Sequence, residues 1–211
     1  MFSWSSRKRD ASAEAPAASP RVDDAVTTSK VLPRLLTALS QASTPVLLDL
    51  GPVVGANVSF FGDRLACKIY VEDLFADIER HARSGSRDAL GAFLAARTFP
   101  QEGSVDAVLC WDLFDYLDQA AGKALATRLT SLLRTGGVLY GFFGTTPVDL
   151  GHYTRFALEG EDTMRQRQYP ATTCRRTVLM TRDINRMFEG LVVAESVLLK
   201  TSTRETLFRK P

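Results

Sequence analysis

The sequence has few of the residues that build disulfide frameworks, metal sites and membrane spans. Of its 211 residues, three are cysteine and two are histidine, and neither a CxxC pair nor a closely spaced histidine pair occurs. Three widely separated cysteines predict neither a disulfide framework nor a zinc site. No stretch approaches the roughly 20 apolar residues that a membrane-crossing helix needs. We therefore expect neither a metal site nor a transmembrane segment.

An excess of charge of one sign is also lacking. Lysine and arginine number 26 against 24 aspartates and glutamates, which gives a formal net charge of +2. This balance supplies no extended positive field, so nucleic acid is not the expected partner. The basic residues at positions 7–9 are not followed by an apolar stretch, so no secretory signal is expected and a cytoplasmic location is the simplest expectation.

Residues 1–28 differ in composition from the rest of the chain. They are rich in alanine, serine, proline and charge, and they carry too little apolar surface to offset the entropy of ordering. We expect a disordered tail over 1–28 and a single globular domain over 29–211, for which an apolar content of 45% is sufficient. Phe2 and Trp4 beside the basic triplet leave open a role for the tail in binding a partner.

Short apolar runs alternate with helical patterns along the domain. The runs "VLLDL" (46–50), "CKIYV" (67–71), "VDAVLCW" (105–111) and "VLYGFF" (138–143) are typical of strands buried on both faces of a parallel sheet. Apolar residues at helical spacing precede or separate them at 29–39, 58–65, 74–82 and 117–132, with "RTGG" expected to end the last helix. The alternation predicts an α/β, Rossmann-like, doubly wound and mostly parallel sheet. Residues 86–100 predict a helix, or a helix leading into a degenerate third strand.

The last third of the chain has a different pattern. "HYTRFAL", "MRQRQY" and "RRTVLMT" resemble short strands separated by polar turns, which predicts a small β-ribbon insertion at about 149–177. A helix is expected over 183–189. "LVVAESVLLK" and "ETLFRK" then predict two strands that pair antiparallel at the C-terminal edge of the sheet.

Polar and glycine residues collect where the predicted parallel strands end. Ligands of open α/β sheets bind outside these carboxyl ends, where Asp49, Gly51, Gly55, Glu72 and Asp112 lie. Glu72 follows the glycine turn by about 20 residues, the interval at which a carboxylate accepts hydrogen bonds from ribose hydroxyls. The alternatives are ordinary: a glycine at a tight turn, or acidic residues that cap a helix.

Three segments, in this order, resemble the class I S-adenosylmethionine-dependent methyltransferase family: "LLDLGPVVG", "GSVDAVLCWDLFDYL" and "LTSLLRTGGVLYG". The resemblance covers about residues 31–210 and implies S-adenosylmethionine as the cofactor. It implies that Asp49 orders the loop near the methionine end of the cofactor, and that Asp112 meets the cofactor's amino group or the substrate. Trp111 is expected either to form a wall of the pocket or to belong to the core.

The resemblance implies methyl transfer to an unidentified substrate aligned under residues 144–177. Asp149, His152 and Tyr153 follow the last parallel strand and are the candidate catalytic residues, with a surface histidine as the ordinary alternative. Five arginines in the insertion are able to receive an acidic small molecule, a phosphate or a protein partner, or to serve solubility alone. They are Arg155, Arg165, Arg167, Arg175 and Arg176.

Two departures from the family pattern favour an alternative. Val53 occupies the position at which the loop usually has a glycine, next to the stiff Pro52. The segment 95–103 offers only Arg97, Thr98, Gln101 and Glu102, so it lacks an obvious carboxylate or amide for adenine. The alternative is a catalytically inactive, methyltransferase-like binding or scaffold protein. A nicotinamide dehydrogenase ranks last, because its GxGxxG loop would need glycines at positions 53 and 56.

Overall fold

The computed structural model describes residues 24–97 and 100–211, so the tail predicted over 1–28 lies largely outside the described residues. The strands are β1 (Asp24–Thr28), β2 (Val46–Asp49), β3 (Lys68–Val71), β4 (Val105–Trp111), β5 (Leu133–Gly144), β6 (Asp149–Leu158), β7 (Thr163–Arg175), β8 (Val192–Leu198) and β9 (Thr203–Arg209). The helices are α1 (Leu32–Leu39), α2 (Gly55–Leu65), α3 (Leu74–Arg83), α4 (Leu90–Ala96), α5 (Gln119–Leu132) and α6 (Thr181–Met187), with two 3-10 turns, η1 (Arg87–Ala89) and η2 (Leu113–Tyr116).

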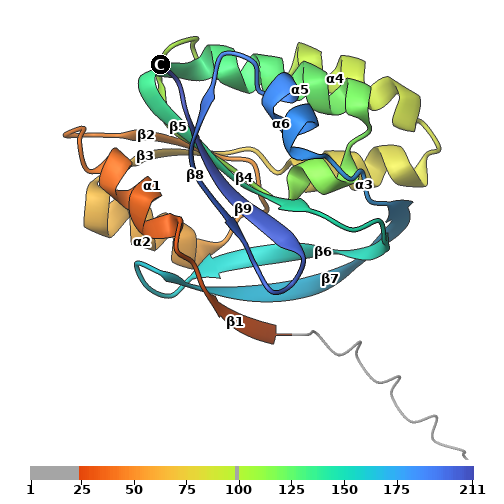
Figure 1. The fold of residues 1–211 in the computed structure, drawn as a ribbon, viewed down its shortest axis with the longest axis horizontal. Coiled ribbons are helices and arrows are strands. Elements are labelled where there is room, and N and C mark those ends of the chain that lie inside the picture. The colour runs from red at the N-terminus through yellow and green to blue at the C-terminus, as the bar shows by residue number, and fades with distance from the viewer. Residues whose placement is uncertain (1–23, 98–99) are drawn as a thin grey trace, which may run out of the picture.

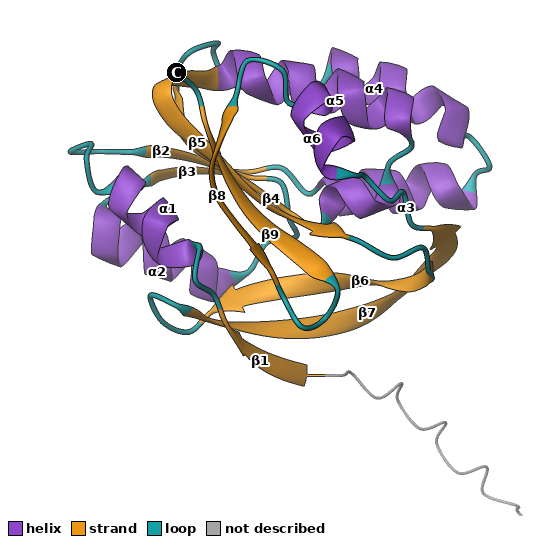
Figure 2. Cartoon of the chain, viewed as in Figure 1, coloured by secondary structure: helices purple, strands orange, loops and turns teal. Residues whose placement is uncertain are grey.

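The central sheet has the predicted arrangement. Its order is β3-β2-β4-β5-β9-β8, with β3, β2, β4 and β5 parallel and β9 antiparallel to both β5 and β8. Figure 2 shows α1 and α2 on one face of this sheet and α3, α4, α5 and α6 on the other. Because both faces are covered, every residue of β4 is buried, as its uninterrupted apolar run predicts. The Rossmann-like class and the antiparallel C-terminal edge are confirmed.

A second, antiparallel sheet closes one end of the central sheet. Its order is β1-β7-β6, and we call it the cap sheet (Figure 1). Strands β6 and β7 are the ribbon predicted over 149–177. The expected third strand there is wrong, because β7 ends at Arg175 and the chain then leads without a strand to α6.

Strand β1 corrects the boundary of the predicted tail. Residues 24–28 were expected to be disordered, but they pair with β7, and the Asp24 carboxylate contacts Arg165 and Arg167, both at 3.1 Å. These partners lie about 140 residues away in the sequence, so a composition window cannot detect them. Residues 24–28 therefore belong to the folded domain.

Two local expectations for the middle of the chain also change. Residues 90–96 form α4, and no third strand follows it in the described part of the chain. The glycine pair does not end α5. That helix stops at Leu132, and Leu133 enters β5 directly by pairing with Val105, so "RTGG" lies inside the strand.

A buried acid joins the start of the domain to its last strand. Glu205 on β9 has no exposed surface, and its Oε1 accepts hydrogen bonds from the Ser29 and Tyr140 hydroxyls. Ser29 Oγ in turn accepts from the backbone amide of Leu32 at 2.7 Å, which satisfies a free donor at the start of α1.

We expect Glu205→Ala to lower the free energy of unfolding by about 3 kcal/mol, because it leaves a cavity and two unpaired hydroxyls. Urea denaturation measures this loss. Glu205→Gln is the matched control, since it keeps the volume and an acceptor and should cost less than half as much. Equal losses for the two variants would contradict the role given to the hydrogen bonds.

Candidate functional site

Asp49 lies at the end of β2 and is buried. Its Oδ1 accepts a hydrogen bond from the Gly51 amide at 2.9 Å and another from Trp111 Nε1 at 2.6 Å. Burial raises the pKa of this carboxyl to about 6, although both hydrogen bonds favour the charged form. Asp49 thus binds the backbone of the loop after β2 and the side chain of Trp111.

The Trp111 indole covers the glycine turn. A Cβ on Gly51 would lie 2.7 Å from Trp111 Cδ1, so only glycine lets the ring pack there. The ring stacks on Phe156 of β6, with centroids 5.0 Å apart and an interplanar angle of 4°. Trp111 has φ of +50°, an uncommon conformation for a bulky residue that persists only where surrounding contacts hold it. The residue is therefore both part of the core and the wall that closes the loop.

The carboxylate of Glu72, the predicted ribose ligand, is also bound by another side chain of the protein. Arg97 donates to Glu72 Oε2 from Nη2 at 2.7 Å and from Nε at 3.2 Å, and its Nη1 contacts Asp77. The capping alternative applies to the neighbour instead, because Asp73 accepts from the Ala76 amide at the start of α3. The Glu72 carboxylate is thus paired with a cation rather than with the helix.

Strand β6 crosses the start of α2 and holds the site shut. Asn57, in the first turn of α2, donates to the Phe156 carbonyl and accepts from the Leu158 amide, both at 2.8 Å. A side-chain amide that satisfies both backbone groups fixes β6 against the loop. This contact was not anticipated, because nothing near position 57 in the sequence indicates a partner about 100 residues later.

Val53 is 66% exposed to solvent and is not packed against the rest of the chain. The neighbouring Gly55 begins α2, and a Cβ added there would meet no atom within 4 Å. Trp111, by contrast, packs directly against the glycine turn.

Asp112 lies in a separate cavity, between the ends of β4 and β5, the cap sheet and the turn between β8 and β9. The cavity has a volume of about 340 Å³. Burial, and then the charge of Asp115, raise the pKa of Asp112 to about 8, against the opposing effects of Thr154 and Arg176. Asp115 accepts from the Gly144 amide at 2.9 Å and pairs with Arg176 Nε at 2.8 Å.

The buried ion pair between Arg176 and Asp115 packs against Gly144. A Cβ on Gly144 would lie 2.4 Å from Arg176 Nε, so the guanidinium packs directly on the glycine backbone. Asp115 was not among the predicted site residues, and Arg176 was predicted only as one of the five arginines of the insertion. An acid just after β4 and an arginine cluster were visible in the sequence, but their pairing required the fold.

The three candidate catalytic residues do not form one group. Asp149 and His152 line the cavity that holds Asp112, with the His152 carbonyl accepting from the Tyr116 hydroxyl at 2.8 Å. Tyr153 instead stacks on Tyr169 at 5.6 Å and packs near Phe75 of α3. The alternation of β6 separates these neighbouring side chains.

Each arginine of the insertion has a partner within the chain. Arg165 and Arg167 contact Asp24, Arg175 contacts Asp149 at 3.1 Å, and Arg176 contacts Asp115. Arg155 lies over the Tyr169 ring, 4.3 Å from its centroid. These contacts favour a structural role for the arginines within the cap sheet over the reception of an acidic partner.

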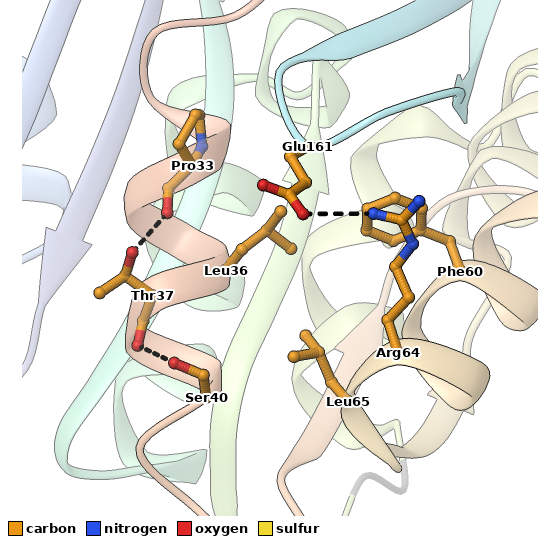
Figure 3. Close-up of a pocket in the computed structure, with 8 residues that line it drawn as sticks. All are labelled: Pro33, Leu36, Thr37, Ser40, Phe60, Arg64, Leu65 and Glu161. Carbon is orange, nitrogen blue, oxygen red and sulfur yellow. Dashed lines mark hydrogen bonds and ion pairs between the residues drawn. The ribbon is translucent and has the colours of Figure 1, made fainter.

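A groove on the outside of the domain contains none of the predicted site residues. It lies between α1 and α2, has a volume of about 540 Å³, and is lined by Pro33, Leu36, Thr37, Ser40, Phe60, Arg64, Leu65 and Glu161 (Figure 3). Arg64 crosses it to reach Glu161 at 3.4 Å. None of these eight described residues presents a buried polar side-chain atom that lacks a hydrogen-bond partner.

Across residues 24–97 and 100–211, no set of three or more histidine, cysteine, aspartate or glutamate side chains is arranged to hold a metal ion. The helices in these same ranges include none with the length and apolar character needed to cross a membrane.

Solved structures of other proteins share this fold. No family model matches the sequence, and no curated protein sequence matches it. The fold is similar to the PH0226 protein from Pyrococcus horikoshii, with a TM-score of 0.53, 13% identity, and coverage of 86% of this chain and 89% of that one. It is also similar to an S-adenosylmethionine-dependent methyltransferase from Clostridium acetobutylicum, with a TM-score of 0.50, 11% identity, and coverage of 87% and 92%. At these identities the likeness concerns the fold alone.

Proposed function

Because the chain has the fold of S-adenosylmethionine-dependent methyltransferases, we propose that it binds this cofactor at the ends of β2, β3 and β4 and transfers its methyl group. In the present conformation the site is closed by the side chains of Trp111 and Arg97. Binding then requires these two side chains to move aside.

The observation that carries the proposal is the chemistry of the two closing contacts. An indole N–H occupies the Asp49 carboxylate, and a guanidinium occupies the Glu72 carboxylate. The cofactor carries donors of the same kind, an ammonium group and two ribose hydroxyls, for these acceptors. In the closed state, the Trp111 N–H and the Arg97 guanidinium therefore occupy the positions that the donor groups of a nucleoside ligand would take.

The residues around the loop have chemistry that suits the cofactor. Glu72 would hold the ribose, Asp49 and the Gly51 backbone would lie near the methionine end, and Phe156 would exclude water from above. When bound, S-adenosylmethionine supplies a methyl group on a good leaving group, so the protein mainly aligns the acceptor. The small space now present near Pro52 and Tyr153, about 170 Å³, is below the usual size of a ligand site.

We expect Glu72→Ala to weaken S-adenosylmethionine binding by more than about tenfold, because a carboxylate that accepts two hydroxyl donors is lost. Isothermal titration calorimetry with S-adenosylmethionine and S-adenosylhomocysteine measures the change. Asp63→Asn, on the exposed side of α2, removes one negative charge elsewhere and should leave the affinity unchanged. An unaltered affinity in Glu72→Ala would refute the ribose assignment.

The second candidate is a methyltransferase-like protein without turnover. It is favoured by the depth of Trp111 in the core, where only 3% of its surface is exposed and Phe156 stacks on it. Moving such a ring exposes a large apolar surface and opposes binding. If neither the natural chain nor Trp111→Ala binds the cofactor at millimolar concentration, this candidate replaces the first.

A further inference from the structure

Phe156 of the cap sheet is stacked between two aromatic rings of the central sheet. Its ring lies 5.0 Å from Trp111 at an interplanar angle of 4°, and 5.0 Å from Phe142 at 12°. The indole also meets the Tyr140 ring edge-on, with centroids 6.1 Å apart. Because protein interiors are close-packed, the indole has no room to leave Gly51 while Phe156 stays in place.

The position of Phe156 is set by Asn57 of α2. The Asn57 side chain is 3% exposed, and its two hydrogen bonds of 2.8 Å go to the Phe156 carbonyl and the Leu158 amide. These backbone groups lie on the free edge of β6, since in the described part of the chain β6 pairs with β7 alone. An edge strand can leave α2 while its ladder with β7 stays intact. The two bonds to Asn57 are therefore the ones that must break for β6 to move.

The opposite edge of the cap sheet is fixed to the domain. The strand order β1-β7-β6 places β1 at that edge (Figure 1). Ser29 directly follows β1, is buried and donates to the buried Glu205. The connection from β5 to β6, by contrast, is exposed over residues 146–148. The cap sheet is thus held along β1 and is free to lift along β6 once Asn57 lets go.

We propose that the cap sheet is a lid over the loop after β2, and that Asn57 is the positioning residue that keeps the lid shut. When β6 leaves Asn57, Phe156 releases the indole of Trp111, which then uncovers Gly51 and Asp49. As a control of cofactor entry, the lid rests on the proposed function. The coupled movement of β6 and Trp111 does not, because it involves only contacts within the chain.

Hydrogen exchange measured by NMR tests the lid in the absence of cofactor. The Trp111 indole N–H is bonded to Asp49 and the Leu158 amide to Asn57, so each exchanges when its contact opens. We expect these two groups to show the same dependence on low urea concentrations. Their protection factors should be at least about tenfold below that of the Val108 amide, in the middle of β4. Protection of the indole equal to that of Val108 would mean that only global unfolding frees Trp111, and would overturn the proposal.

Replacing Asn57 tests its positioning role. Asn57→Ala should raise indole exchange about tenfold relative to exchange at Val108, because both bonds to the edge of β6 are lost. Asp118→Ala is the matched control, since it removes a side-chain acceptor of a backbone amide at the start of α5. The control should leave the ratio of the two exchange rates unchanged. An unchanged ratio in Asn57→Ala, or an equal rise in both variants, would contradict the role of Asn57.

Glu79 supplies a second variant if Asn57→Ala does not fold. Glu79 of α3 accepts from the Thr172 amide and hydroxyl, both at 2.9 Å, and so fastens the cap sheet on its α3 side. Its side chain is partly exposed, so Glu79→Ala should be milder and should shift the exchange ratio in the same direction. A ratio that does not shift would overturn the lid.

The rate of cofactor binding separates the lid from the proposed function. By stopped-flow mixing, we expect S-adenosylmethionine to associate with Asn57→Ala about tenfold faster than with the natural chain, because the open state is more populated. Faster indole exchange in a chain that does not bind S-adenosylmethionine at millimolar concentration would refute the proposed function alone. Binding at an unchanged rate, with an unchanged exchange ratio, would refute the lid alone.

Discussion

Replacing Trp111 with alanine is expected to change stability and cofactor affinity in opposite directions. The indole is 3% exposed and donates to Asp49, so its removal should lower the free energy of unfolding by about 4 kcal/mol. The same change uncovers Gly51 and frees the Asp49 carboxyl. We expect S-adenosylmethionine to bind Trp111→Ala about tenfold more tightly than the natural chain, because no ring has to be displaced. Calorimetric titration and urea denaturation measure the two effects.

A matched variant separates closure of the site from general loss of packing. Phe143 is equally buried, but it packs on the opposite face of the sheet, against Phe114, Phe188 and Phe208. Phe143→Ala should lose comparable stability without gaining affinity. If both alanine variants bind the cofactor as the natural chain does, the indole does not control access to the loop.

Raising the pH from 5 to 8.5 is expected to lower the free energy of unfolding by several kcal/mol. Burial raises the pKa of Asp49 and of Asp115 to about 6, and that of Asp112 to about 8. Glu205 is raised in the same direction by burial. A carboxyl with a raised pKa in the folded state binds its proton more tightly when folded. Its stabilising effect is therefore complete below the unfolded pKa and is lost as the pH rises through the folded value.

The decrease in the free energy of unfolding should occur in two ranges of pH. Asp49 and Asp115 act below about pH 6, and Asp112 extends the decline to about pH 8. Asp112→Asn should flatten the upper part and make the lower part less steep, as measured by urea denaturation at half-unit intervals of pH. Stability that is constant or rises from pH 6 to 8 in the natural chain would contradict the burial of a neutral Asp112.

Closure of the proposed site explains how one loop can resemble a cofactor site and yet contain little free space. Sequence patterns compare residue types at positions along the chain, and by that measure Val53 is the departure. In the structure Val53 is exposed, whereas Trp111 reaches the loop from the end of β4. The contact that covers the loop joins residues about 60 positions apart.

Elements with local or periodic causes could be predicted from the amino-acid sequence. Uninterrupted apolar runs indicated β2, β3, β4 and β5, because strands buried on both faces need no polar side. Their alternation with helices required parallel pairing, which in turn placed Asp49, Glu72 and Asp112 near one edge of the sheet. The antiparallel C-terminal edge was predictable because β8 and β9 lie close together along the chain.

The contacts between distant side chains could not be predicted in this way. The fold brought Arg97 to Glu72, Asn57 to β6, Arg176 to Asp115 and β1 to β7, all across intervals that no local pattern records. Side-chain direction also separated His152 from Tyr153, since neighbours on a strand face opposite sides. Strand order depends on local pattern and chain connectivity, but the occupancy of a site depends on the packing of side chains that the fold brings together from distant parts of the chain.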